Sequence, residues 1–201
     1  MNARTITIGE CSKVLPGFSA KGAIIDELDG TVQVVMAQHL TKGEQYHYRP
    51  EHRLKITPPR NGEKYLIKPG DILFMSRGVN NYAVLIEDIP QPAIAPLTFY
   101  ILRPRGEVIP AYLAWCLNQE PAREQISSIR TGAGTPMVPR NGLAEITIPL
   151  PPLDVQQQLA TFADLQAREA KLLRELVDET ERMRRLAGQR LLTKLIGAIG
   201  Q

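Results

Sequence analysis

The amino-acid sequence predicts an α+β protein, in which a mixed, mostly β domain with short helices (residues 1–150) precedes one long helix (residues 151–201). Short apolar runs separated by Gly and Pro turns fill roughly the first hundred residues, which indicates strands. After Pro110 the apolar period lengthens to that of helices, and beyond Pro152 one apolar stripe continues to Ile196. With 22% charged and 43% hydrophobic residues, the composition is that of a soluble folded protein.

The strands are predicted in order along the domain, between turns such as Lys42-Gly43-Glu44, residues 58–62 and Pro69-Gly70-Asp71. They are residues 33–36, 54–57, 65–67, 72–75, 83–86, 98–102 and 146–148. The runs at 83–86 and 98–102 are apolar throughout, so we expect both strands to be central in a sheet.

Two short helices are predicted between the last two strands. The first begins at Pro110 and places Tyr112 and Trp115 on its buried side, so we assign both rings to the core rather than to base stacking. The second runs from Ala122 to Ile129, and a glycine-rich loop at 131–136 follows it.

The long helix has a well-marked start. Three prolines, ending at Pro152, prevent helix upstream, and Asp154 with Gln157 has the spacing of a capping box. We therefore predict a helix from Asp154 to Ile196. At 100° per residue one side of it is apolar. The residues expected to mediate dimerisation are Leu165, Leu172, Leu173, Leu176, Val177, Met183 and Leu191.

That apolar side requires a cover. Each Leu that stays exposed forfeits roughly 1.5 kcal/mol or more of the free energy that its burial would contribute, so pairing with a second helix is favoured. The alternative is a helix that folds back over its own domain, but no Gly or Pro hinge lies between Leu153 and Gly188.

The net charge, the cysteines and the histidines argue against several other classes of protein. The net charge is +3, so a polyanionic partner needs a local basic patch. Cys11 and Cys116 are far apart and no secretory pattern opens the chain, so we expect a cytoplasmic protein without disulfides or a membrane anchor. His39, His47 and His52 lack zinc-motif spacing, and we expect no metal.

Five segments follow one another along the second part of the chain. They are KPGDILFMSRG (Lys68–Gly78), FYILRP (Phe99–Pro104), IPAYLAWCLN (Ile109–Asn118), the TGAGTP loop and NGLAEITIPLPPLDVQQQLA (Asn141–Ala160). In this order and at this spacing they resemble the DNA-specificity (S) subunit of type I restriction-modification systems. The resemblance covers Tyr65 to the C-terminus well and the first sixty residues loosely.

The resemblance implies a target recognition domain followed by a coiled-coil spacer helix. A full S subunit carries two such units whose helices pair antiparallel, whereas this chain has one. We therefore expect a homodimer that reads a bipartite, inverted-repeat site in double-stranded DNA. The implied partners are an adenine methyltransferase (M) subunit, which would bind S-adenosylmethionine, and a restriction motor (R) subunit.

The chain itself is expected to be non-catalytic and to bind no cofactor. It has no methyltransferase Pro-Pro-Tyr motif and no phosphate-binding Walker loop. Asp71 is interpreted as a residue that hydrogen-bonds its own turn rather than as a catalytic carboxylate.

Candidate DNA contacts are basic, amide and aromatic residues in loops, because these side chains read base edges and hold phosphates. The candidates are Lys42, Tyr46, His47, Arg49, Arg53, Arg77, Asn80, Asn81, Arg130, Thr131 and Arg140, and Lys55 is a further phosphate candidate.

Each group of candidates has an alternative interpretation. Asn80-Asn81 can serve as a plain turn, 46–53 as a solvated edge strand and 130–136 as a structural turn. Arg103 and Arg105 fit DNA positioning or solubility.

Two other functions stay open at this stage. One is a coiled-coil scaffold that assembles proteins without reading DNA. The other is a small nuclease or hydrolase. Loss of selective DNA binding after alanine substitution at Arg77 or around His47, with the oligomer intact, would separate DNA reading from the scaffold.

Overall fold

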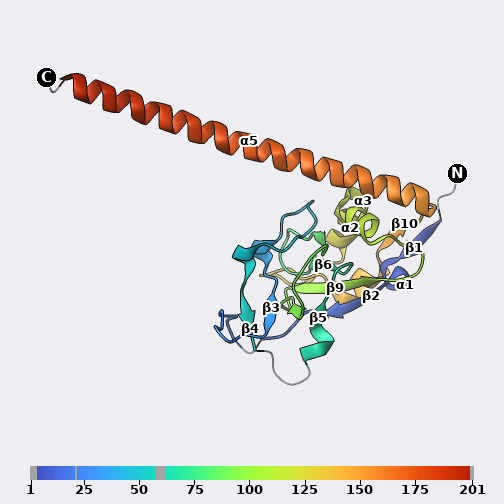
Figure 1. Ribbon diagram of the computed structural model, residues 1–201. Coiled ribbons are helices and arrows are strands. Elements are labelled where there is room, and N and C mark those ends of the chain that lie inside the picture. The colour runs from blue at the N-terminus through green and yellow to red at the C-terminus, as the bar shows by residue number, and fades with distance from the viewer. Residues whose placement is uncertain (1–3, 21, 58–61, 200–201) are drawn as a thin grey trace. The chain divides into compact units, whose positions relative to one another are not determined.

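The computed structural model describes residues 4–20, 22–57 and 62–199, with side chains up to Ile196 (Figure 1). Most of the turn predicted at 58–62 therefore lies outside the described residues. The chain divides into two compact units, Met1–Ala163 and Asp164–Gln201. None of the helices in the described part is long and apolar enough to cross a membrane.

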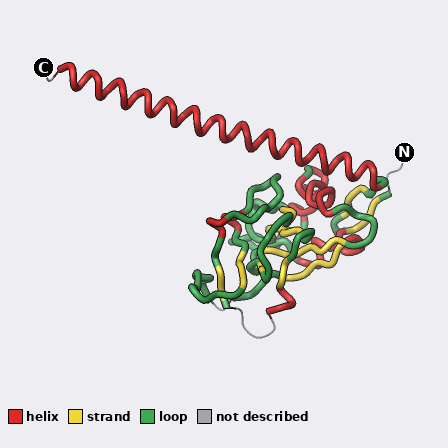
Figure 2. Tube along the Cα trace, in the orientation of Figure 1, coloured by secondary structure: helices red, strands yellow, loops and turns green. Residues whose placement is uncertain are grey.

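Short strands and helices alternate through the first unit (Figure 2). The strands are β1 (Thr5–Thr7), β2 (Ser12–Pro16), β3 (Val32–Val34), β4 (Lys55–Ile56), β5 (Leu66–Ile67), β6 (Ile72–Met75), β7 (Ala83–Leu85), β8 (Ala93–Ile94), β9 (Phe99–Pro104) and β10 (Thr147–Pro149). The helices are α1 (Ile8–Cys11), α2 (Pro110–Asn118), α3 (Glu120–Ser128), α4 (Arg140–Glu145) and the long α5 (Leu153–Ile199). Three single turns of 3-10 helix lie at Ala37–His39, Pro50–His52 and Gly62–Tyr65.

A four-stranded antiparallel sheet of order β2-β9-β6-β7 is the centre of the fold. Its residues alternate between two apolar cores, because successive side chains point to opposite faces of a strand. Ile72, Phe74 and Leu102 face one core, while Leu73 and Ile101 face the other. The centre of this sheet is therefore buried on both sides, which is why β6, β7 and the first four residues of β9 carry almost only apolar side chains.

Helices cover the first face and a second sheet covers the other. Tyr112, Leu117, Ile126 and Leu143 from α2, α3 and α4 pack into the first core. The second sheet has the order β4-β3-β8-β5 and encloses the other core together with a smaller cluster around Phe18. A two-stranded ladder, β1-β10, joins the start of the first unit to its end.

The sequence predictions were correct for the apolar strands and incomplete elsewhere. Strand β6 coincides with the predicted 72–75, and α2, α3, β9 and β10 lie within one or two residues of their predicted positions. The expectation that residues 83–86 form a central strand was wrong, since β7 is at the edge of its sheet. Elements β1, α1, β2, β8 and α4 were not predicted.

Helix α5 begins at Leu153, directly after the prolines. The predicted capping box was wrong, because the helix already includes Leu153, so that Asp154 lies inside it rather than at its N-cap. Gln156 holds the helix start instead and is 1% exposed. Its amide accepts a hydrogen bond from Ile109 N (2.9 Å) and donates to the carbonyl oxygens of Glu107 and Pro151 (2.9 Å each).

We predict that Gln156→Ala lowers the free energy of unfolding of the first unit by about 2–4 kcal/mol, because three partly buried backbone groups lose their hydrogen-bond partner. Gln157→Ala is the matched control, since Gln157 is exposed in the same helical turn. Urea unfolding measures both. Equal losses for the two variants would show that the Gln156 amide does not anchor the helix.

Candidate nucleic-acid interface

Two loop segments that are far apart in the sequence, the turn after β6 and the loop before α4, meet at one edge of the domain. Arg77 lies opposite Met137 in an antiparallel bridge, and Met137 lies opposite Thr131 in a second bridge. Met137 and Thr131 exchange both backbone hydrogen bonds, at 2.8 and 2.9 Å. Gly78 N donates to Pro136 O, and Val138 N donates to Ser76 O, on either side of the first bridge.

This pairing places three side chains in one row. Residues directly opposite each other in antiparallel pairs point to the same face, with Cβ atoms about 4.5–5.5 Å apart. Arg77 and Thr131 are exposed, and Met137 is 38% exposed. Their neighbours Ser76 and Val138 point inward and are buried. We call Arg77, Met137 and Thr131 the recognition row.

Two glycines and one asparagine shape the turns that carry the row. Gly78 and Gly132 have positive φ angles of 81° and 100°, which side-chain-bearing residues rarely adopt. Asn81 is buried, and its amide donates to the carbonyls of Met75 (3.0 Å) and Gly78 (3.3 Å). The prediction that Asn81 contacts DNA is therefore corrected, because its amide closes the turn that presents Arg77 and the exposed Asn80.

Arg140, at the start of α4, lies near the row. Burial raises the pKa of the Tyr100 phenol, and the positive charges of Arg140 and Arg77 oppose that rise. Both guanidinium groups are therefore within electrostatic reach of one hydroxyl group, which donates to Val138 O at 2.9 Å. The structure thus brings Arg77 next to Thr131 and Arg140, which the sequence had already grouped around the glycine-rich loop.

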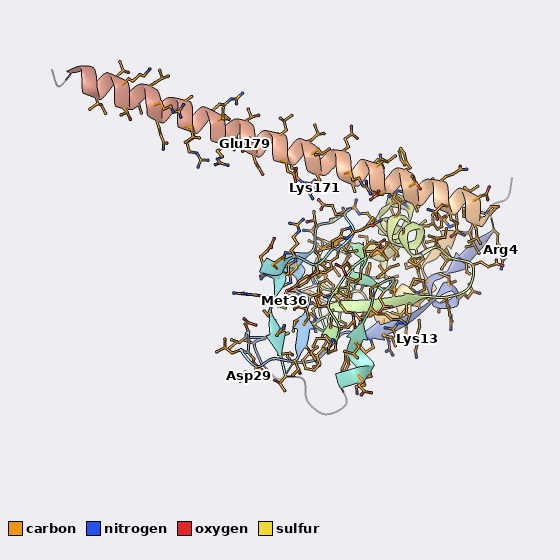
Figure 3. All side chains as sticks on the ribbon, viewed as in Figure 1. Arg4, Lys13, Asp29, Met36, Lys171 and Glu179 are labelled. Atoms are coloured by element: carbon orange, nitrogen blue, oxygen red, sulfur yellow. The ribbon has the colours of Figure 1, made fainter. Side chains whose placement is uncertain are left out.

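A basic groove begins at Arg140, with a volume of about 380 Å³. Lys13, Arg105 and Arg140 are its charged lining residues, beside Asn141 and Ser12, and no carboxylate is among the described residues that line it. Figure 3 labels Lys13, which is exposed. A phosphate backbone is attracted to such a cationic groove. Sequence reasoning missed Lys13 and Asn141, because a charged strand residue and a helix-start amide resemble ordinary surface positions.

Arg105 is held by the domain itself. It donates hydrogen bonds to the carbonyl oxygens of Gly9 (2.7 Å) and Glu10 (3.1 Å). Arg103 makes a bidentate contact with Asp71 (2.7 and 2.8 Å) and also binds Leu66 O. Asp71 accepts from Lys68 N at 3.1 Å and is 1% exposed, so its predicted role in the turn is confirmed.

The second predicted cluster lies at the other end of the β6–β7 hairpin. Tyr46 pairs with Ile86, at the end of β7, whereas Arg77 follows the end of β6. Tyr46 is 3% exposed, so its assignment as a DNA contact is corrected. Its burial raises its pKa to about 12. Its ring lies 5.8 Å from His52, which stacks on His39 at 4.5 Å.

The remaining members of this cluster stay predictions. Lys42, His47, Arg49, Arg53 and Lys55 are exposed. Exposed Glu51 and Asp88 lie among or beside them, so the local charge is mixed. The groove beside Arg140 is therefore the stronger attractor for phosphate.

Arg130 differs from its neighbour Thr131. It is half-buried, and its Nε atom has no hydrogen-bond partner within the described structure. It lines a polar pocket with Asn81 and Ser127 rather than the face of the recognition row. Loop 131–137 is closed by the Thr131–Met137 pair, so its structural interpretation as a turn is confirmed and its role toward phosphate stays a prediction.

No other chemistry emerges from the described residues. Burial raises the pKa of Cys11 and of Cys116 to about 11 each, so both thiols stay protonated and inert near neutral pH. No group of three or more His, Cys, Asp or Glu among these residues is arranged to hold a metal ion.

The two aromatic rings of α2 belong to the core, as predicted. Tyr112 is buried, and its hydroxyl donates to Pro149 O. Trp115 is half-buried and packs against the core that the helices cover.

The fold is similar to solved structures of type I systems. A chain from a structure describing complex assembly and conformational transition of a type I R-M system matches with a TM-score of 0.65 and 18% identity, over 89% of this chain and 41% of that one. The HsdS subunit from Thermoanaerobacter tengcongensis matches with a TM-score of 0.59 and 18% identity, over 83% and 37%. The S subunit from M. genitalium matches with a TM-score of 0.59 and 14% identity, over 89% and 42%.

This chain thus spans about two fifths of the length of the solved chains that it matches. No curated protein matches it. The family model of the type I restriction modification DNA specificity domain matches residues 6–177, which is most of the sequence. The chain therefore belongs to the family of type I restriction modification DNA specificity domains.

Proposed function

We propose that this chain is the sequence-specific DNA-recognition subunit of a type I adenine methyltransferase complex, and that two copies pair through α5 to read a bipartite, inverted-repeat site. The observation that carries the DNA-reading part is the recognition row near a groove whose charged lining residues are all cationic. It puts base-reading side chains near residues that bind phosphate. In protein–DNA interfaces the phosphate contacts position the protein and the base contacts specify the sequence.

The charges match a DNA ligand better than the net charge suggests. The chain carries only +3 overall, but Lys13, Arg105 and Arg140 line one groove, and all of the charged residues in its lining are cationic. Phosphate contacts of this kind dominate affinity and make it sensitive to salt. They position the recognition row against the base edges without themselves selecting a sequence.

Pairing through α5 follows from its exposed apolar residues. The seven residues of the predicted stripe are between 56% and 64% exposed. Fully burying each of them would contribute roughly 1.5–3 kcal/mol. A second copy offers the same stripe, so a two-fold axis buries both together. Intrahelical ion pairs, such as Arg168–Asp164 at 2.8 Å, occupy other positions and leave the stripe free for a partner helix.

The helix pair would set the distance between the two half-sites. Helix α5 has 47 residues, which corresponds to a length of about 70 Å. The register of the pair, rather than any base contact, would then fix the length of the unread spacer. Because two identical domains are related by a two-fold axis, the two half-sites would be inverted copies of one sequence.

The chemistry would come from other subunits. We infer that the M subunit holds S-adenosylmethionine and methylates adenine, that a motor subunit cleaves unmodified DNA, and that this chain binds no cofactor and supplies no catalytic group. The competing function, a coiled-coil scaffold, shares the helix pairing but not the DNA contacts. The two experiments below separate them.

We predict that Arg140→Ala weakens DNA binding and reduces the slope of log affinity against log salt by about one, because it removes a phosphate contact, and that Arg77→Ala weakens binding and relaxes the sequence preference, because it removes a base-reading side chain. The readout is a fluorescence titration at several salt concentrations, with and without the methyltransferase subunit. Arg123→Ala is the matched control, since this exposed Arg on α3 is paired with Glu120 at 3.3 Å. Wild-type protein that binds no DNA in either setting would favour the scaffold.

For α5 we predict that Leu176→Glu with Met183→Glu converts a dimer into a soluble monomer, because each change buries a carboxylate in an apolar seam. Mass by light scattering measures this directly. The matched control is Asp178→Asn with Arg185→Gln, which alters the opposite side of the same helix and should leave the dimer intact. A wild-type monomer, or a dimeric double-Glu variant, would refute pairing through the stripe.

A further inference from the structure

We propose that Met137 reads the methyl group of a thymine, so that the recognition row specifies an A·T base pair in each half-site. This inference rests on the proposed DNA-recognition function and deepens it. It assigns a specificity-determining role to a side chain that the sequence left among ordinary loop residues.

The backbone of Met137 is fixed more firmly than that of a typical loop residue. Both its N–H and its carbonyl are bonded to Thr131, and both of its neighbours are bonded to the turn at 76–78. Its side chain is nevertheless 38% exposed, while Val138 beside it is fully buried. The fold therefore holds an apolar thioether in a defined position on the surface.

The neighbours of Met137 indicate what it meets. It lies between the cation Arg77 and the hydroxyl of Thr131, and Arg140 and the groove lie nearby. An apolar patch on a partner protein would gain little binding free energy from contact with these charged surroundings. Double-stranded DNA offers the complementary surface, because phosphates flank a groove whose one apolar group is the thymine methyl.

Geometry selects the major groove. With neighbours about 4.5–5.5 Å apart, the row is about 10 Å long, close to three base-pair steps of about 3.4 Å. The thymine methyl is exposed only in the major groove, which is about 12 Å wide. Asn80 is exposed in the same turn as Arg77, and an amide is the side chain that pairs with the adenine opposite a thymine.

The test removes one methyl group from the DNA. A bound sequence is first selected from a random duplex pool, using the full chain with its methyltransferase subunit. Each thymine is then replaced by deoxyuridine, which lacks only the 5-methyl group. We expect one position per half-site at which this replacement weakens wild-type binding about fourfold, the effect of one apolar carbon.

Protein variants assign the effect to Met137. With Met137→Ala, thymine and deoxyuridine at that position should bind equally, and the thymine duplex should bind more weakly than it binds wild type. With Met137→Leu the preference for thymine should persist, because an apolar side chain remains. Leu28→Ala is the control, since Leu28 is a fully exposed apolar residue away from the row. Thermal melting confirms that each variant is folded.

Several results would overturn the assignment. They are equal wild-type affinity for thymine and deoxyuridine at every position, a selected half-site without an A·T pair, or an unchanged preference in Met137→Ala. Loss of the methyltransferase subunit from Met137→Ala would make the residue a protein contact instead. Selective binding without a methyl effect removes this inference alone, whereas the absence of any selective binding removes the proposed function with it.

Discussion

The account depends on one constraint, the apolar stripe of α5. The helix continues without a break through 47 residues, and the seven Leu, Val and Met side chains of the predicted stripe are more than half exposed. A stripe of this size is stable in water when another apolar surface covers it. A second copy of the chain is the cover that we propose, because it offers the same stripe. The inverted site and the fixed spacer that we propose depend on that pairing.

The recognition row depends on a different constraint, the burial of the sheet that carries it. The sheet β2-β9-β6-β7 is buried on both faces, which fixes the ends of its strands rigidly. The turn after β6 and the loop before α4 leave this sheet and pair with each other through Met137. A rigid scaffold thus carries exposed side chains on short, hydrogen-bonded loops, and such loops are where binding residues concentrate. The polar contacts of Asn81 and the glycines at 78 and 132 supply the local geometry.

The sequence predicted the parts of the molecule that periodicity governs. Strand β6, helices α2 and α3, and the start of α5 after Pro152 follow from apolar spacing and proline, which are local signals. The contacts that it did not predict are long-range. Nothing near Asp71 indicates Arg103, and nothing near Gln156 indicates Ile109. Tyr46 and Asn81 were taken for surface residues because their neighbours are polar, yet tertiary packing buries both. Arg77, Thr131 and Arg140 were each predicted, but their meeting around Met137 depends on pairing between distant loops.

The measurement that tests the central claim most directly is the form of the DNA that the intact complex selects from a random duplex pool. Two identical domains held by paired helices can enrich only one kind of site. Our account predicts two inverted copies of a single short half-site, separated by an unread spacer of one fixed length. Enrichment of a single undivided sequence, or of half-sites at variable distances, would contradict it.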